Sequence, residues 1–132
     1  MREVTEQMTK TEHEATAELD IQLKRAYQPP AAADGIRILV DRLWPRGLTK
    51  AAAAVDRWMR DLAPSTDLRR WFGHDPSRWD EFRREYAREL RARGDLLEEV
   101  RSLARRGRVT LLFGARNEAH NDAVALREVL LK

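Results

Sequence analysis

The sequence predicts an α/β protein: a single small domain whose short, mainly parallel sheet is flanked by helices in a Rossmann-like, three-layer arrangement. Two observations support this fold class. Segments with strand and helix patterns follow one another in the order strand, strand, helices, strand, helix. The chain has 132 residues, of which 42% are hydrophobic, enough for one core. We expect residues 21–132 to form this domain and the polar residues 1–20 to be a flexible N-terminal extension.

The three predicted strands differ in their hydrophobic patterns. Residues 21–25 alternate apolar and polar side chains, as in a half-buried strand. Residues 36–40 form a mostly β-branched run that ends at a charged pair. Residues 109–113 are apolar on both faces, which is typical of an interior strand in a parallel sheet.

The helices are predicted from apolar residues at spacings of three and four, together with capping signals. The first spans residues 51–62, with Thr49 as its N-cap, and ends before Pro64. The remaining helices are expected over residues 66–72, 76–93, 96–106 and 119–131. With so few strands, much of the core must come from helices packed on helices.

Composition limits the chemistry of the protein. The chain has no cysteine, which excludes disulfides, thiolate nucleophiles and zinc–thiolate sites and fits a reducing cytoplasm. No apolar run approaches the ~20 residues of a membrane span, and the N-terminus lacks the apolar core of a signal peptide. We therefore expect a cytoplasmic protein with no membrane association.

The charges are numerous but nearly balanced. The chain has 25 Lys and Arg against 22 Asp and Glu, a net charge of +3. Arginines concentrate in residues 69–93 and 101–108, and both stretches lie in predicted helices that also carry glutamates. Solvated helix faces with pairs of opposite charge are the ordinary explanation, and a nucleic-acid surface is the alternative.

A candidate site is predicted where two strands end. Residues 36–40 lead into Asp-Arg-Leu-Trp-Pro-Arg-Gly (41–47), and residues 109–113 lead into the turn at 114–121. Ligands bind at the carboxyl ends of the strands in open α/β sheets. If the two strands are parallel neighbours, their turns meet in one pocket.

The predicted pocket favours an anionic ligand. Its ligand-binding candidates are Arg42, Trp44, Arg46, Arg116, Asn117 and Asn121. Arginine forks match phosphate and carboxylate geometry, so we expect a phosphate-bearing small molecule. The catalytic candidates are His120 and Asp41, as general acid or base. No metal site is predicted, because His13 lies in the extension and His74 at a helix break, and no cofactor can be assigned.

Each candidate also has a structural interpretation. Asp41 can cap its turn or pair with Arg42, and a lone histidine such as His120 is more often structural than catalytic. Arg46 can stack on the indole of Trp44. Asn117 can cap the closing helix.

These segments together resemble the YeaO-like family of uncharacterised bacterial proteins, a domain of unknown function. The matching segments are residues 21–27, 38–47, 62–69, 71–76 and 109–121. The resemblance implies a small cytoplasmic α/β protein and supports the position of the pocket. Related proteins of the wider superfamily carry a cysteine in the turn after the last strand. This chain has Gly114-Ala115-Arg116 there, so their thiol chemistry does not apply.

The leading functional prediction is a pocket for an anionic small molecule, in either an enzyme or a binding protein. One alternative is nucleic-acid binding through the arginine-rich helices at residues 69–106. Another is a protein–protein interaction module, as a monomer or a homodimer. The chain has no glycine-rich phosphate loop, which argues against ordinary ATPase or dehydrogenase chemistry.

Overall fold

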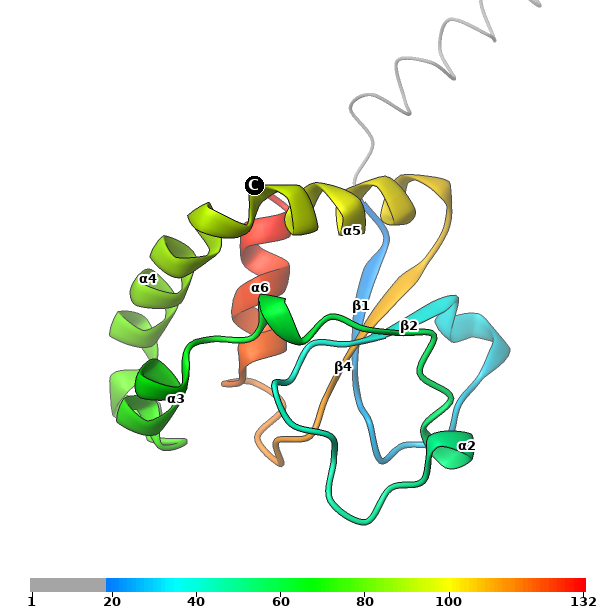
Figure 1. Ribbon diagram of the computed structural model, residues 1–132, viewed down its shortest axis with the longest axis horizontal. Coiled ribbons are helices and arrows are strands. Elements are labelled where there is room, and N and C mark those ends of the chain that lie inside the picture. The colour runs from blue at the N-terminus through cyan, green and yellow to red at the C-terminus, as the bar shows by residue number, and fades with distance from the viewer. Residues whose placement is uncertain (1–18) are drawn as a thin grey trace, which may run out of the picture.

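A four-stranded parallel sheet forms the centre of the computed structural model, which describes residues 19–132 (Figure 1). The order is β1–β4–β2–β3. The strands are β1 (Ile21–Arg25), β2 (Ile36–Leu39), β3 (Arg57–Trp58) and β4 (Val109–Phe113). The α/β fold class with a parallel sheet is confirmed. The predicted extension, residues 1–20, lies outside the described residues except for its last two.

The pairing of β2 with β4 is the one on which the predicted site depends. Ile36 lies opposite Val109 and Leu39 opposite Leu112, in parallel register. On its other side β4 pairs with β1. The two charged turns therefore follow neighbouring parallel strands, as the site prediction required.

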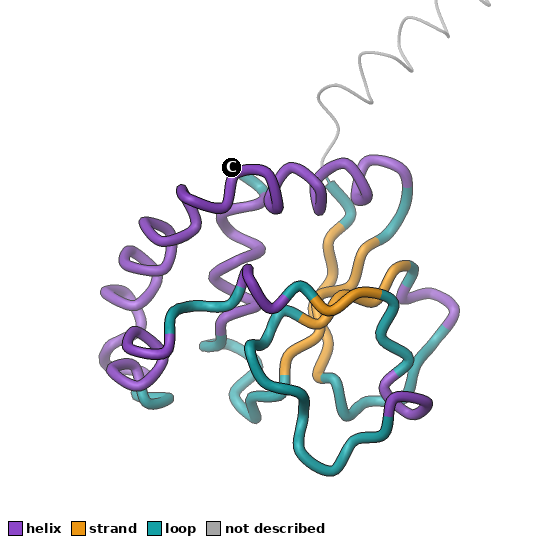
Figure 2. Tube along the Cα trace, in the orientation of Figure 1, coloured by secondary structure: helices purple, strands orange, loops and turns teal. Residues whose placement is uncertain are grey.

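The described part of the chain has five α-helices beside this sheet. They are α2 (Lys50–Ala53), α3 (Thr66–Phe72), α4 (Trp79–Leu90), α5 (Gly94–Arg106) and α6 (Asp122–Leu130). Short 3-10 turns are η1 (Ala32–Asp34), η2 (Arg60–Leu62), η3 (Pro76–Arg78) and η4 (Arg91–Arg93). Figure 2 shows α4 and α5 following each other in an arc along the outside of the molecule. No helix of residues 19–132 is long and apolar enough to cross a membrane.

The predicted helix over residues 51–62 is wrong beyond its first turn. Thr49 caps α2 as expected, but Ala54 adopts a left-handed conformation with φ 46° and ends the helix. Arg57 and Trp58 then form the edge strand β3 beside β2. Backbone bonds from Asp56 to Arg37 and from Met59 to Leu39 fix this pairing. The open edge of β2 thus overrides the local helix propensity of the alanines.

The two faces of the sheet have different covers. One face presents Ile21, Ile38 and Leu111 to a core that includes residues of α3, α4, α5 and α6. Three aromatic rings extend this core toward the strand ends: Phe72 stacks on Phe82 at 4.3 Å, and Phe82 contacts Tyr86 at 5.6 Å.

The opposite face is covered mainly by the segment at residues 41–58. Leu39 and Leu112 pack there beneath Trp44 and Trp58, whose rings meet edge to face at 5.5 Å. Of the five helices only α2 lies in this segment. The second layer is therefore mostly irregular chain.

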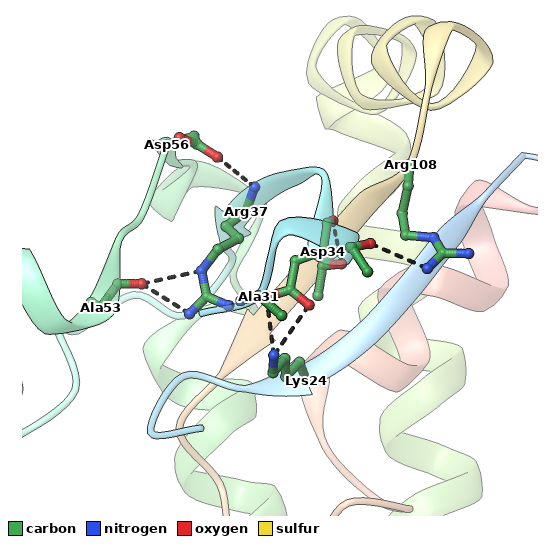
Figure 3. Close-up of polar contacts among 9 residues, drawn as sticks. Lys24, Ala31, Asp34, Arg37, Ala53, Asp56 and Arg108 are labelled. Carbon is green, nitrogen blue, oxygen red and sulfur yellow. Dashed lines mark hydrogen bonds and ion pairs between the residues drawn. The ribbon is translucent and has the colours of Figure 1, made fainter. Parts of the chain in front are cut away.

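A buried ionic network lies on this second face (Figure 3). Arg37, only 3% exposed, donates to Asp34 at 2.6 Å and makes two bonds to the Ala53 carbonyl, at 2.9 and 3.2 Å. Lys24 also binds the Asp34 carboxylate, and Thr110 donates to the Asp34 carbonyl. The network therefore ties η1 and α2 to β1, β2 and β4.

Candidate functional site

A cavity of about 250 Å³ lies at the carboxyl ends of β2 and β4. Its polar lining consists of Asp41, Arg42, Arg69, His74, Asn121 and Asp122. Its apolar lining consists of Leu43, Ala63, Pro64, Phe72, Phe82 and Ala115, with Gly114 completing the wall. The cavity is at the sheet edge where the sequence predicts a pocket.

Asp41 joins the two turns that follow β2 and β4. Its Oδ2 accepts a hydrogen bond from the Gly114 amide at 2.7 Å. A Cβ on Gly114 would lie 3.2 Å from this oxygen, so the absence of a side chain lets the carboxylate approach closely. The Asp41 carbonyl accepts from the indole of Trp58 at 2.8 Å. The carboxylate is therefore held from the turn after β4, and the backbone of Asp41 is held from β3.

Asp122 faces Asp41 from the first turn of α6. The pKa of Asp122 lies well above its ordinary value, because burial disfavours its charged form and the negative charge of Asp41 adds to this effect. A hydrogen bond between the two carboxyl groups acts in the same direction. The pair thus keeps a proton at pH values where an isolated aspartate has lost it.

Two arginines bring positive charge to the same cavity. Arg42 donates from Nη2 to the Pro64 carbonyl at 3.4 Å, while its Nε is buried without a hydrogen-bond partner in residues 19–132. Arg69, on α3, is exposed. Neither arginine forms an ion pair within that described part of the chain. Arg42 therefore has donor capacity that the protein does not use.

The wall opposite these strands is anchored on α4. Tyr86 donates from its hydroxyl to the Leu62 carbonyl. Burial raises the pKa of Tyr86 well above its ordinary value, with Asp122, Asp41 and Glu89 adding to it, so the hydroxyl stays a donor. Glu89 accepts from both the amide and the hydroxyl of Ser65, at 2.8 and 2.6 Å.

The structure brings three of the sequence-predicted site residues to the cavity. Asp41, Arg42 and Asn121 line it. Asn121 also caps α6 by accepting from the Val124 amide at 3.0 Å. Its side-chain amide donates to the Asn117 carbonyl. The hydrogen-bonding groups of the Asn121 side chain are thus largely used within the turn and the helix cap.

Three predicted residues of the second turn lie apart from this lining. Asn117 accepts from the Ala119 and His120 amides, both at 2.9 Å. His120 places its ring 5.1 Å from that of Trp79. Arg116 is exposed.

The two remaining predictions lie on the turn after β2. Trp44 points to the opposite face of the sheet, where its indole donates to the Leu48 carbonyl at 2.6 Å. Arg46 is exposed, and its carbonyl accepts from the Tyr27 hydroxyl. Neither belongs to the cavity lining.

Sequence reasoning missed three polar residues of the cavity: Asp122, Arg69 and His74. An aspartate in the first turn of a helix is common for electrostatic reasons, so Asp122 carried no distinguishing signal. Arg69 belonged to a series of arginines with a solvent-exposed interpretation. His74 has φ 58°, a conformation uncommon for a non-glycine residue, which the sequence did not indicate.

We expect Asp122→Asn to stabilise the protein more at about pH 7 than at about pH 4. Because the folded-state pKa of Asp122 is raised, the unfolded chain loses this proton first as the pH increases. At pH values above the ordinary aspartate pKa, the aspartate at position 122 therefore lowers the stability of the folded protein. Asparagine at this position removes that destabilisation. Melting temperatures of both proteins at the two pH values measure the effect.

Asp95→Asn is the control, because Asp95 is exposed in the first turn of α5. There the negative charge favours the helix, so its loss should slightly lower the melting temperature at neutral pH. If Asp122→Asn behaved like Asp95→Asn, the assignment of a costly carboxyl group at Asp122 would be wrong.

A metal site of protein ligands is not evident in residues 19–132. No group of three or more His, Asp or Glu side chains there is arranged to hold an ion. What the cavity offers is hydrogen bonding and charge: two carboxyl groups, two arginines and an apolar wall.

The fold and cavity define a class: a small α/β protein with a polar cavity at the carboxyl edge of a parallel sheet. Comparison with known proteins is more specific. A family model described as "Inactive DUF488-N3 subclade" matches residues 20–132, and the chain belongs to this family. The predicted relationship to YeaO-like proteins is confirmed.

Its relatives share most of the chain. It is 39% identical over 112 residues to the uncharacterized protein YeaO of Escherichia coli (strain K12), covering 85% of this chain and 97% of YeaO. It is also 39% identical over 113 residues to the uncharacterized protein Rv3073c of Mycobacterium tuberculosis, covering 86% of this chain and 95% of that protein. No solved structure matches the chain.

Proposed function

We propose that the cavity binds a small anionic molecule, through a phosphate or carboxylate group placed on Arg42 and Arg69. The buried Nε of Arg42 carries this proposal. A buried donor without a partner is costly, and an oxygen of a bound anion would supply the acceptor. Arg69 lines the same cavity and is exposed toward solvent, so it can add a second cationic contact.

Binding is better supported than turnover as the role of this cavity. The matching family model carries the description "inactive". His120, the acid–base candidate of the sequence, packs on Trp79 and is not part of the cavity lining. Asp41 is in the lining, but its carboxylate is held by the Gly114 amide. We therefore assign Asp41 to ligand positioning.

The nucleic-acid alternative has weaker support. Several arginines of α4 and α5 pair with glutamates of their own helix. These pairs are Arg88–Glu85, Arg101–Glu98 and Arg105–Glu98. Such pairing is typical of a solvated helix face and lowers the positive charge available to a phosphate backbone.

Arg42→Gln is expected to weaken binding of a small anion at least about tenfold, the effect of losing one charged hydrogen bond. Thermal unfolding of the full chain with inorganic phosphate, acetate and simple phosphate esters identifies the binding anion. Calorimetric titration then gives the affinity for the wild type and the variant.

The matched control is Arg88→Gln, which removes an exposed arginine of α4 that is not part of the cavity lining. Its affinity should equal that of the wild type. Equal losses in both variants would mean that net charge, not the cavity, attracts the anion. Stabilisation by oligonucleotides alone, erased by salt, would favour the nucleic-acid alternative.

A further inference from the structure

We infer that the ligand of this cavity carries hydroxyl groups beside its anionic group, as a phosphorylated sugar or polyol does, and that Asp41 and Asp122 bind those hydroxyls. This inference rests on the proposed anion site at Arg42 and Arg69. It adds the chemistry of the part of the ligand that does not contact the arginines.

The cavity lining carries charges of both signs. An anion fits the two arginines, but the same space is lined by a pair of carboxyl groups whose remaining negative charge repels it. A bare phosphate therefore satisfies only part of the lining. A ligand that fills the cavity must present hydrogen-bond donors to Asp41 and Asp122.

The carboxyl pair has hydrogen-bonding capacity left for a ligand. Asp41 uses Oδ2 for the Gly114 amide, and Asp122 uses Oδ1 for the Ala123 amide, at 2.7 and 3.0 Å. These bonds orient both carboxyl groups, and each carboxyl group can accept further hydrogen bonds through its remaining lone pairs. A hydroxyl both donates and accepts, so it suits a pair in which one carboxyl group retains a proton.

Hydroxyl groups suit the charge of this cavity better than an amine does. An ammonium group would also bind carboxylates, but it would enter a cavity that already holds two arginines. The retained proton leaves the carboxyl pair with less negative charge than two free aspartates. Neutral hydroxyls avoid adding a third positive charge.

The cavity volume and wall limit the size of the ligand. About 250 Å³ is below the range of roughly 300–1,000 Å³ typical of sites for drug-sized molecules. Phe72, Phe82 and Pro64 provide an apolar side against which a carbon skeleton can pack. A compact phosphorylated polyol meets all of these conditions.

The test is calorimetric titration of the full chain with ribose 5-phosphate, inorganic phosphate and phosphoethanolamine. We expect ribose 5-phosphate to bind at least about tenfold more tightly than phosphate, from hydrogen bonds to the carboxyl pair. In Asp122→Ala this advantage should disappear while the affinity for phosphate stays or rises. Asp122→Asn, which retains hydrogen-bonding groups and keeps position 122 uncharged, should preserve most of this advantage.

Asp95→Ala serves as the control and should keep the wild-type preference, because Asp95 is exposed on α5. Equal binding of phosphate and ribose 5-phosphate would overturn this inference and leave the anion site intact. Tighter binding of phosphoethanolamine would assign the pair to an amine and also overturn it. Failure of every anion to bind would instead remove the proposed function itself.

Discussion

An alanine in place of Gly35 is expected to lower the free energy of unfolding by about 3 kcal/mol or more. Gly35 has φ 64° and ψ −135°, a conformation open essentially to glycine alone. A Cβ at this position would lie 2.1 Å from the Arg108 carbonyl oxygen. That oxygen accepts the Ile36 amide at the start of the β2–β4 pairing, so relieving the clash would disturb the centre of the sheet.

The control for Gly35→Ala is Gly94→Ala. Gly94 begins α5 with helical backbone angles, and a Cβ there meets no atom within 4 Å. Alanine should stabilise this position by roughly 0.5–1 kcal/mol, because it restricts the unfolded chain and favours the helix. Denaturant unfolding of both variants measures the contrast. A Gly35→Ala variant as stable as the wild type would contradict the close approach to Arg108.

Arg37→Met is expected to lower the free energy of unfolding by about 3 kcal/mol or more, which is typical when one partner of a buried ion pair is removed. Methionine keeps much of the apolar stem of Arg37 but loses the bond to Asp34 and both bonds to the Ala53 carbonyl. Ala53 is fully buried, so water cannot easily replace these bonds. The change in denaturant midpoint gives the loss.

Arg57→Met is the corresponding surface control. Arg57 pairs with Glu99 while both side chains are 44% exposed, and such pairs contribute less than about 1 kcal/mol to stability.

The two variants should also differ in the pH dependence of their stability. Burial raises the pKa of Asp34, but hydrogen bonds from Ala31, Lys24 and Arg37 outweigh it and leave the pKa lowered.

The lowered pKa of Asp34 fixes the sign of that dependence. The stability that Asp34 contributes to the folded protein is fully present above the ordinary aspartate pKa. It is lost as the pH falls through the lowered pKa of Asp34 in the folded state. Arg37→Met should therefore reduce the acid sensitivity of unfolding, whereas Arg57→Met should leave the Asp34 contribution unchanged. Equal costs for the two variants would show that the buried network contributes little.

Much of this fold could be predicted from local patterns. The apolar run at residues 109–113 and the shorter run at 36–40 indicated two buried strands, and they pair as parallel neighbours. The edge strand at Arg57 and Trp58 could not be predicted in the same way. Its two residues are strand only because β2 offers a free edge, whereas the preceding alanines favour a helix.

The candidate site was predictable in position but only partly in membership. Asp41 and Arg42 directly follow a buried strand, and the structure places both at the cavity. Trp44, two residues further along, turns to the other face, which depends on packing against Trp58 at the far end of the segment 41–58. The sequence did not single out Asp122, because an aspartate is common in the first turn of a helix even where there is no functional site.

The residues that line the cavity come from two parts of the fold that are held in place by different contacts. Asp41 and Asp122 are attached to β2 and α6, whereas Arg69 and Phe72 belong to the short helix α3. That helix is fixed to α4 by the hydrogen bonds between Ser65 and Glu89 and by the stacking of Phe72 on Phe82. A ligand touching both parts would join them, so its binding free energy would oppose local opening of α3. A bound ligand would then slow the local unfolding of α3 and leave the local unfolding of the sheet unchanged.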